Sequence, residues 1–502
     1  MNTNLPRRRF LRHSLLALPA AALPFERLFA ADAVPADLEA VTGDGKQILL
    51  KGTDVRDFAA RLRGEVLFAN STGYEPARHA WNGAFDRHPA LIARCTGAAD
   101  VMEAVSFAAS NNLLLSVRGG GHSLSGQSVC EKGLMIDLSL MNGVRIDVAR
   151  KVAYVEGGAL LGALDREALA NGLVTTAGTV SHTGVGGLTL GGGFGRLSRK
   201  FGLTCDNVRS IDLVNARGKF ANVNDASDRE LFWGLRGGGG NFGVATSFEF
   251  QLHPVDPVMI GGELAYSWED SPAMLKHYYE FCATAPDELN LDAALVRLPN
   301  DERFLSLDVT WCGPRERADA VLKPLREFRK PIRDTVTAAP YVALQKASDD
   351  ALSHGHRYYV KAGFLQKFDP ALVDAAIATI AEANLPAVQV LVMPHAGGAI
   401  ARVKPNATAF AQRAATHSVM LLSRWDDPAT SDGVAAWIKS SWKKIEPLTH
   451  GFYVNDYTPE DAARLGTTYG ANFGRLVALK TRVDPNNLFR LNANVAPKPK
   501  PA

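Results

Sequence analysis

The sequence predicts an α+β fold of two domains, in which the chain leaves the first domain for the second and then returns. With 502 residues, the chain is too long for one hydrophobic core. Up to residue 256, short strands end repeatedly in glycine-rich runs, whereas from 257 to 450 glycine is scarcer and strand-like runs alternate with amphipathic helices. The glycine-rich and aromatic texture partly returns after residue 450. We therefore expect a first domain over 42–256, an inserted domain with a helix-covered antiparallel sheet over 257–450, and a segment over 451–496 that packs back on the first domain.

The first domain should consist of short strands and helices in alternation. Apolar residues spaced like Val101, Ala104, Val105 and Ala108 place one face of a helix toward the core. The expected helices cover 98–111, 159–170 and 231–235, and the expected strands cover 89–93, 113–117, 134–138, 144–147, 152–156, 208–215, 220–223 and 244–250.

The inserted domain should begin after Pro254 and Pro257, which interrupt the preceding pattern. Its expected helices are 273–284, 317–328, 372–383 and 433–443, and its clearest strands are 304–310, 358–365 and 388–394.

The N-terminus has the features of an export signal. Arg7 and Arg8 precede Phe10, and the apolar stretch 15–23 that follows is too short to span a membrane. A small-residue site at 31–33 closes a segment over 1–33 that resembles a twin-arginine signal. We expect the twin-arginine export machinery as a partner, a periplasmic or secreted location, and no membrane span in the mature chain.

Composition excludes several other classes of protein. The formal net charge is +3, and no long basic run follows the first dozen residues, which disfavours nucleic-acid binding. No cysteine pair has C-x-x-C spacing, so neither a zinc site nor a redox pair is expected, and we predict no metal. The odd cysteine count permits one disulfide and leaves at least one thiol unpaired within the chain; the cysteines are Cys95, Cys130, Cys205, Cys282 and Cys312.

Three glycine clusters indicate close approach of the backbone to a ligand. Residues 118–123 follow a strand, and their N–H groups can converge on an anion such as a pyrophosphate. Residues 178–195 interleave glycine with apolar side chains, which favours contact with a flat ring over a flexible linker. The G-x-G-x-x-G spacing within 237–243 lies between a helix and a following strand, which is the reverse of a Rossmann unit. The sequence contains no Walker A motif. It also contains no G-x-S-x-G elbow, which disfavours a hydrolase with Ser123 as nucleophile.

Four segments together resemble the berberine-bridge-enzyme-like branch of the FAD-linked oxidases, which share the vanillyl-alcohol-oxidase (p-cresol-methylhydroxylase-type) fold. They are SVRGGGHSLSGQSV, GLTLGGGFGRLSRKFGLTCDNV, DRELFWGLRGGGGNFGV and the C-terminal YVND…NFGRLVALKTRVDPNNLFR. They occur in the family's order and are spread over most of the chain, so the combination is specific although any single glycine run is not.

The resemblance implies an FAD cofactor bound to His122 through the 8α position of the flavin ring. A neutral imidazole is nucleophilic, and such a tether raises the oxidising power of the flavin. Many relatives add a cysteinyl bond at a position that falls near Val180 here, where no cysteine stands, so a single link is expected. The implied cofactor-binding residues are Arg118, Gly119, Gly120, Gly121, His122, Ser123, Gln127, Asp137, Gly178, Thr179, His182, Gly186, Gly187, Gly192, Asp206, Asn207, Gly243, Val244, Tyr453, Asn455 and Asn472.

The C-terminal stretch 452–457 is expected to be a strand whose alternation places Tyr453, Asn455 and Tyr457 on one face, over the flavin. After this Asn the family often continues Tyr-Arg-Asp, whereas this chain has Asp456, Tyr457 and Thr458. Relatives use a Glu or Tyr as base, and the inserted-domain stretch 401–413 offers no carboxylate. Tyr453 is therefore the first candidate base, Tyr457 the second and His395 the third.

The resemblance thus implies a two-electron oxidation of an alcohol, sugar or amine-type small molecule by hydride transfer to flavin N5, with O2 reduced to H2O2. Two alternatives remain: a flavin dehydrogenase that uses another acceptor, and a binding protein that keeps the flavin fold without turnover. Sugar, phenolic alcohol, amine and polyketide substrates are all compatible with the sequence.

Overall fold

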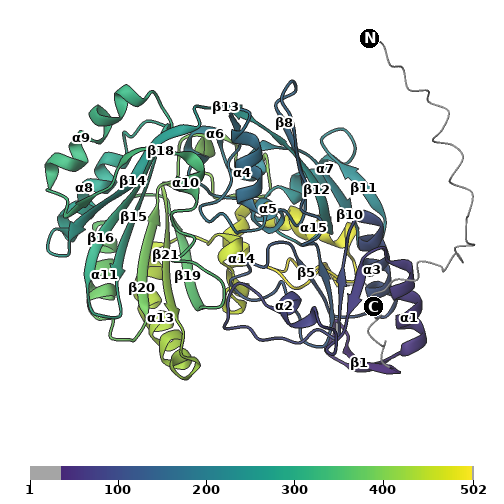
Figure 1. Cartoon of the computed structure of the whole chain (residues 1–502). Coiled ribbons are helices and arrows are strands. Elements are labelled where there is room, and N and C mark those ends of the chain that lie inside the picture. Colours follow the sequence, from purple (N-terminus) through teal and green to yellow (C-terminus); the bar gives the residue numbers. More distant parts are fainter. Residues whose placement is uncertain (1–35, 500–502) are drawn as a thin grey trace, which may run out of the picture.

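The computed structural model describes residues 36–499 and consists of two sheet-containing halves joined along one side (Figure 1). The predicted export signal lies outside the described residues. Within 36–499, no helix combines the length and the apolar character needed to cross a membrane.

A four-stranded sheet of order β3-β4-β6-β5 forms one part of the first half. β4 and β5 run parallel to β6, and β3 runs antiparallel to β4. Every residue of β6 is buried, as expected for a strand covered on both faces. The elements of this part are β1 (Asp37–Val41), β2 (Gln47–Lys51), α1 (Gly52–Arg61), β3 (Glu65–Leu67), α2 (Tyr74–Arg78), β4 (Leu91–Arg94), α3 (Ala98–Ser110), β5 (Leu115–Arg118) and β6 (Leu134–Asp137).

An antiparallel sheet of order β11-β10-β12-β8-β7 forms the other part of the first half. Its core is continuous with the flanking helices α4, α5 and α7 and with α15 (Phe473–Val483). The elements are β7 (Val144–Asp147), β8 (Val152–Glu156), α4 (Leu161–Leu169), β9 (Leu173–Val174), α5 (Val185–Gly191), α6 (Ser198–Phe201), a 3-10 turn (Thr204–Asn207), β10 (Val208–Val214), β11 (Phe220–Val223), α7 (Arg229–Leu235), β12 (Val244–Gln251) and β13 (His253–Pro254).

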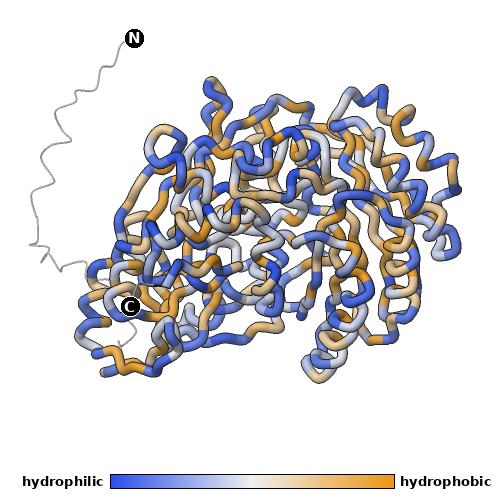
Figure 2. The backbone as a smooth tube through the Cα atoms, turned by 180° about the vertical axis from the view of Figure 1, so that it is seen from behind, coloured by the Kyte–Doolittle hydropathy of each residue, from blue (hydrophilic) through white to orange (hydrophobic). Residues whose placement is uncertain are grey.

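The second half is an eight-stranded antiparallel sheet of order β17-β14-β16-β15-β20-β21-β19, with β18 added to β14. A layer of four helices, α8, α9, α11 and α13, shares one buried core with the sheet. Hydrophobic stretches (orange) run along this sheet in Figure 2, while many of the connecting loops are hydrophilic. The elements are β14 (Val258–Ser267), α8 (Ser271–Cys282), β15 (Leu289–Arg297), β16 (Arg303–Trp311), α9 (Ala318–Phe328), β17 (Arg333–Asp334), β18 (Thr337–Pro340), α10 (Tyr341–Gln345), β19 (Arg357–Leu365), α11 (Pro370–Ala381), β20 (Val388–Pro394), α12 (Ala399–Arg402), β21 (His417–Trp425) and α13 (Ser431–Ile445).

The C-terminal segment lies between the two halves in Figure 1 (yellow) and packs on the first. The buried ammonium of Lys480 secures it by donating to the backbone carbonyls of Asn241 (2.7 Å) and Phe489 (2.9 Å) and to the Asp484 carboxylate (2.6 Å). A charge without solvent contact requires such complete pairing. The segment contains two 3-10 turns (Val454–Asp456 and Pro459–Arg464), α14 (Leu465–Tyr469), a third turn (Gly470–Asn472) and α15 (Phe473–Val483).

The α+β class and the elements that the sequence predicts are confirmed with small shifts of their ends, with one exception. The strand predicted over 452–457 is wrong. Pairing ends at His450, which bridges Phe364, and the chain then turns, with the Asp456 amide donating to the Tyr453 carbonyl (2.8 Å). All five cysteines are free, so the disulfide that the sequence permits does not form.

Candidate functional site

A cavity of about 390 Å³ lies where the glycine-rich loops of the first half meet the C-terminal segment and the inserted domain. Its size is typical of a site that encloses much of a small ligand. The walls are formed by five stretches of chain and a few single side chains. The stretches are 119–125 with 127–128, 183–184 with 186–188 and 190, 239–240 with 243–245, 453–457, and 489 with 491–493; Trp81, Leu352, Met420 and Leu422 are among the single residues.

Two of the glycines allow backbone to pack directly on backbone beside the cavity. A Cβ on Gly120 would lie 2.3 Å from the amide nitrogen of Gly184, and one on Gly184 would lie 2.3 Å from that of Gly120. A side chain at either position would therefore separate the segments. Gly187, which also lines the cavity, has no neighbouring atom within 4 Å of an added Cβ, so its open side is space that a ligand could fill.

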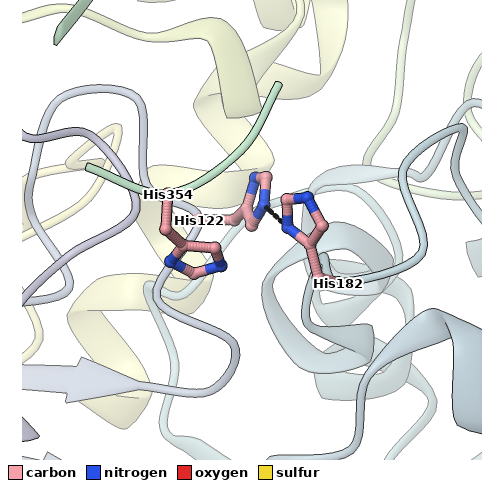
Figure 3. Close-up of side chains that lie close together, drawn as sticks. All are labelled: His122, His182 and His354. Carbon is pink, nitrogen blue, oxygen red and sulfur yellow. Dashed lines mark hydrogen bonds between the residues drawn. The ribbon is translucent and has the colours of Figure 1, made fainter. Parts of the chain in front are cut away.

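His122, His182 and His354 converge beside this wall (Figure 3). The Nε2 atom of His122 lies 2.7 Å from Nδ1 of His182, within hydrogen-bonding distance. The ring of Trp81 stacks on the His122 ring, with centroids 4.5 Å apart. Burial, with smaller contributions from His182 and His354, lowers the pKa of His122 to about 2. His122 is therefore a neutral imidazole at any physiological pH.

The segment that carries His182 is tied to a loop of the inserted domain. The Asp349 carboxylate accepts hydrogen bonds from the Ser181 amide (2.8 Å) and the Ser181 hydroxyl (2.5 Å). The Asp349 backbone carbonyl lies 3.5 Å from Nε2 of His182. The histidine pair is thus positioned jointly by both halves of the molecule.

Tyr453, Asn455 and Tyr457 all line the cavity although they do not lie on a strand. The Tyr453 hydroxyl oxygen accepts hydrogen bonds from the Gly193 amide (2.9 Å) and the Asn455 side chain (2.7 Å). Burial raises the pKa of Tyr453 far above its usual value and also raises that of Tyr457. Both phenols are therefore protonated at neutral pH.

Asp456 lines the cavity although the sequence does not predict it as a site residue. Its carboxylate has no hydrogen bond or ion pair with any residue in the described part of the chain. Burial, and secondarily the charge of Asp461, raises the pKa of Asp456 to about 7. Its position directly after Asn455 is the sequence feature that could have indicated a role for Asp456. The strand predicted over 452–457 would have placed its side chain on the face opposite the site.

Most glycines and polar residues predicted to bind the cofactor line the cavity. Those in its wall are Gly119, Gly120, Gly121, His122, Ser123, Gln127, Gly186, Gly187, Gly243, Val244, Tyr453 and Asn455. His182 reaches the site through its hydrogen bond to His122.

The remaining predicted residues lie outside the wall, and most of their polar groups are engaged elsewhere. The Asp137 carboxylate pairs with Arg94 (3.3 Å), and that of Asp206 binds the Arg413 guanidinium through two contacts of 2.7 Å. The Asn207 amide donates to the carbonyls of residues 201 and 203, and the Asn472 amide to those of 405 and 408.

Gly178, Thr179 and Gly192 are also absent from the wall. The Gly178 carbonyl accepts a hydrogen bond from Gln345 (3.1 Å), and Gly192 adopts a φ of 131° against the Phe410 ring. Arg118 lies behind the 119–123 turn, where its Nε is buried without a hydrogen-bond partner among the described residues and sits 3.2 Å from the Cβ position of Gly121.

His395, the third candidate base, does not line the cavity. Its ring stacks on His417, with centroids 5.2 Å apart, and its Nε2 accepts a hydrogen bond from Arg199 (2.9 Å). Burial lowers its pKa to about 2. The structure therefore gives His395 a role in the core of the inserted domain.

Comparisons with known protein families and with individual relatives all point to FAD-linked oxidoreductases. Residues 89–224 match the family described as FAD binding domain, and residues 453–496 match the family described as berberine and berberine like. A FAD-linked oxidoreductase of Dictyostelium discoideum is 31% identical over 88% of this chain and 97% of its own length. Chitooligosaccharide oxidase of Gibberella zeae is 27% identical, covering 84% of this chain and 89% of its own.

A solved structure extends the likeness to the fold. The crystal structure of 6-hydroxy-D-nicotine oxidase from Arthrobacter nicotinovorans superposes with a TM-score of 0.81 at 26% identity, covering 87% of this chain and 98% of that one. The predicted p-cresol-methylhydroxylase-type fold is thereby confirmed, as is the resemblance to berberine-bridge-like enzymes.

The cavity fits FAD. Backbone in direct contact at Gly120 and Gly184 leaves room for a flat ring beside it, and the open side of Gly187 extends that space. The Arg118 guanidinium behind the 119–123 turn donates from Nη1 to the Ala77 carbonyl, while its Nε has no hydrogen-bond partner among the described residues. It supplies positive charge where a pyrophosphate would be favoured. The residues of the 119–123 turn, and those of the segment that contains Gly184 and Gly187, would hold the cofactor.

Replacing Gly187 with valine should empty the site without unfolding the protein. The added side chain would enter free space, so we expect normal far-UV circular dichroism and at least a fivefold fall in the ratio of flavin to protein absorbance. Gly474→Val is the matched control, because Gly474 is also a helical glycine with no atom within 4 Å of an added Cβ. A normal flavin content in Gly187→Val would mean that the cofactor does not use this wall.

Proposed function

Because the chain belongs to the berberine-like family of FAD-linked oxidoreductases, we propose that it is an exported oxidase that carries FAD covalently on His122. The observation that carries the proposal is the position of His122. It is a neutral imidazole in the wall of the cavity, directly after the glycine turn that fits a pyrophosphate.

Bound FAD supplies a ring that takes two electrons from a substrate C–H bond. The protein must hold the substrate against that ring and accept the proton released from its O–H or N–H group. Backbone packing at Gly120 and Gly184 joins two segments of the cavity wall without a gap between them.

We assign the proton acceptor to Asp456 in preference to the tyrosines. Both phenols stay protonated at neutral pH, whereas a carboxyl with a pKa of about 7 is ionised in part and has the strength suited to a base. The Tyr453 oxygen already accepts two N–H groups, so its own hydrogen is free to be donated. Tyr453 would thus orient the substrate and Asp456 would take its proton.

The substrate class follows from the same residue. One relative is named for a chitooligosaccharide and a solved neighbour for a hydroxynicotine, so a sugar and an amine are the two leading classes. Asp456 is the only Asp, Glu, Lys or Arg among the described residues that form the cavity wall, and the imidazole of His122 in the same wall is neutral. A lone carboxylate can pair with a protonated amine, which favours the amine class.

Two alternatives remain, and simple measurements separate them. Faster reoxidation of the reduced protein by a dye than by O2 would make it a dehydrogenase instead of an oxidase that forms H2O2. Failure of every amine and sugar tested to bleach the flavin absorbance would favour a binding protein without turnover.

Acid precipitation tests the covalent link. The wild-type pellet should stay yellow, while His122→Ala should release its flavin to the supernatant. His354→Ala, which removes a neighbouring histidine, should behave like the wild type. Free flavin in the wild-type supernatant would remove His122 from this role and leave the fold unaffected.

Asp456→Asn should lower kcat about a hundredfold, the lower limit for loss of a general base, with little change in flavin content. Because the pKa of Asp456 is raised to about 7, the active carboxylate form accumulates above that pH. The pH profile of kcat/KM reports groups of the free enzyme, so wild-type kcat/KM should rise through pH 7, and this rise should be absent in the variant. The exposed Asp374→Asn is the control; an unchanged pH profile in Asp456→Asn would exclude Asp456 as base.

Export rests on Arg7 and Arg8, which precede a short apolar stretch. The double replacement Arg7→Lys with Arg8→Lys should leave the precursor inside the cell, as judged by fractionation and immunoblotting. Arg12→Lys should not. Equal distribution of the double variant and the wild type would argue against the twin-arginine route.

A further inference from the structure

We propose that His182, held by the Asp349 carbonyl, positions His122 for attachment of the flavin by fixing which ring nitrogen of His122 carries the lone pair. This inference rests on the proposed covalent link and names the groups that prepare it. His182 is a positioning residue here, because it acts through His122.

The argument starts at a group that can only accept hydrogen bonds. The backbone carbonyl of Asp349 faces Nε2 of His182 at 3.5 Å, a long contact. A carbonyl has no hydrogen to give, so Nε2 of His182 must be the donor. In a neutral ring the other nitrogen, Nδ1, then carries the lone pair.

The next contact transmits this choice to His122. Nδ1 of His182 lies 2.7 Å from Nε2 of His122. Since Nδ1 of His182 can only accept, Nε2 of His122 must donate its hydrogen. The lone pair of His122 is therefore on Nδ1, which has no hydrogen-bond partner among residues 36–499. Nδ1 is the nucleophile that this arrangement presents.

Several contacts keep the arrangement rigid. Ser181, next to His182, binds the Asp349 carboxylate through both its amide and its hydroxyl. Trp81 stacks on the His122 ring and in turn on Tyr358. His354 contacts the pair only through its ring, 4.9 Å from His182 and 5.7 Å from His122 between centroids. It has no hydrogen bond to either ring and so cannot set the tautomer.

The attachment step balances with O2 as oxidant. A C–N bond forms between Nδ1 of His122 and the 8α carbon of the flavin, and a C–H bond of that methyl group breaks. As Nδ1 becomes bonded, the hydrogen on Nε2 of His122 is lost toward Nδ1 of His182. Two electrons and two protons leave in total; the electrons enter the flavin ring and pass with the protons to O2, giving H2O2.

A matched pair of variants tests the role of the acceptor. Leucine and asparagine have nearly the same shape, but only asparagine places an acceptor oxygen where Nδ1 of His182 lies. We measure the covalent fraction as in-gel flavin fluorescence, normalised to total flavin released by proteolysis, in the full-length protein. The covalent fraction of His182→Leu should be at least fivefold below that of the wild type. His182→Asn should retain at least half of the wild-type covalent fraction, and His354→Leu should have the wild-type value.

The other possible results contradict either the role of His182 or the attachment of flavin to His122. Covalent fractions in His182→Leu equal to the wild type would overturn the proposal, as would equal losses in the Leu and Asn variants or a loss in His354→Leu. A wild type without covalent flavin would instead refute the attachment to His122 itself, which separates that failure from this one.

A second measurement on the wild type needs no variant and so cannot be confounded by misfolding. Two-dimensional NMR of the purified flavin peptide identifies the imidazole nitrogen bonded to the 8α carbon. A bond to Nδ1 is expected. A bond to Nε2 would overturn the proposal, because the hydrogen bond to His182 would then have to be absent when attachment occurs.

Discussion

The site depends on the crossing of two backbone segments at Gly120 and Gly184, at a separation that leaves no room for a Cβ atom on either. The crossing also determines the geometry of the histidines, because His122 follows Gly120 by two residues and His182 precedes Gly184 by two. A side chain at the crossing would push apart both the cavity wall and the 2.7 Å contact between the two rings. The close packing of these two glycines therefore determines both the shape of the cavity wall and the contact between the two histidine rings.

Desolvation then gives each ionisable group its character. Burial keeps His122 neutral, which preserves a lone pair for bonding, and keeps the tyrosines protonated. The same effect on Asp456 raises the pKa into the neutral range, where a carboxyl can exchange protons at physiological pH. Burial in one cavity wall thus leaves a neutral imidazole, protonated phenols and a carboxyl that titrates near neutral pH.

The inserted domain helps to position the residues of the site through hydrogen bonds to the first half. Asn82 in the first half and Tyr358 in the second exchange hydrogen bonds of 2.9 and 3.0 Å, and the Asp349 loop binds the segment that carries His182. These contacts join residues more than 160 positions apart in the chain. Attachment of a cofactor at His122 would accordingly require both halves to be folded and docked.

The sequence by itself determined the α+β class, most helices and strands, the glycine clusters and His122, because periodicity and glycine density are local signals. Only the tertiary structure decided which polar residues reach the cavity. Asp206 and Asn472 carry side chains suited to a cofactor, yet Arg413 and distant backbone carbonyls engage them. Asp456 joined the site because the chain turns at Tyr453 instead of continuing as a strand, and the partner of His182 lies in a loop 167 residues away. Such pairings depend on long-range packing, which no local pattern encodes.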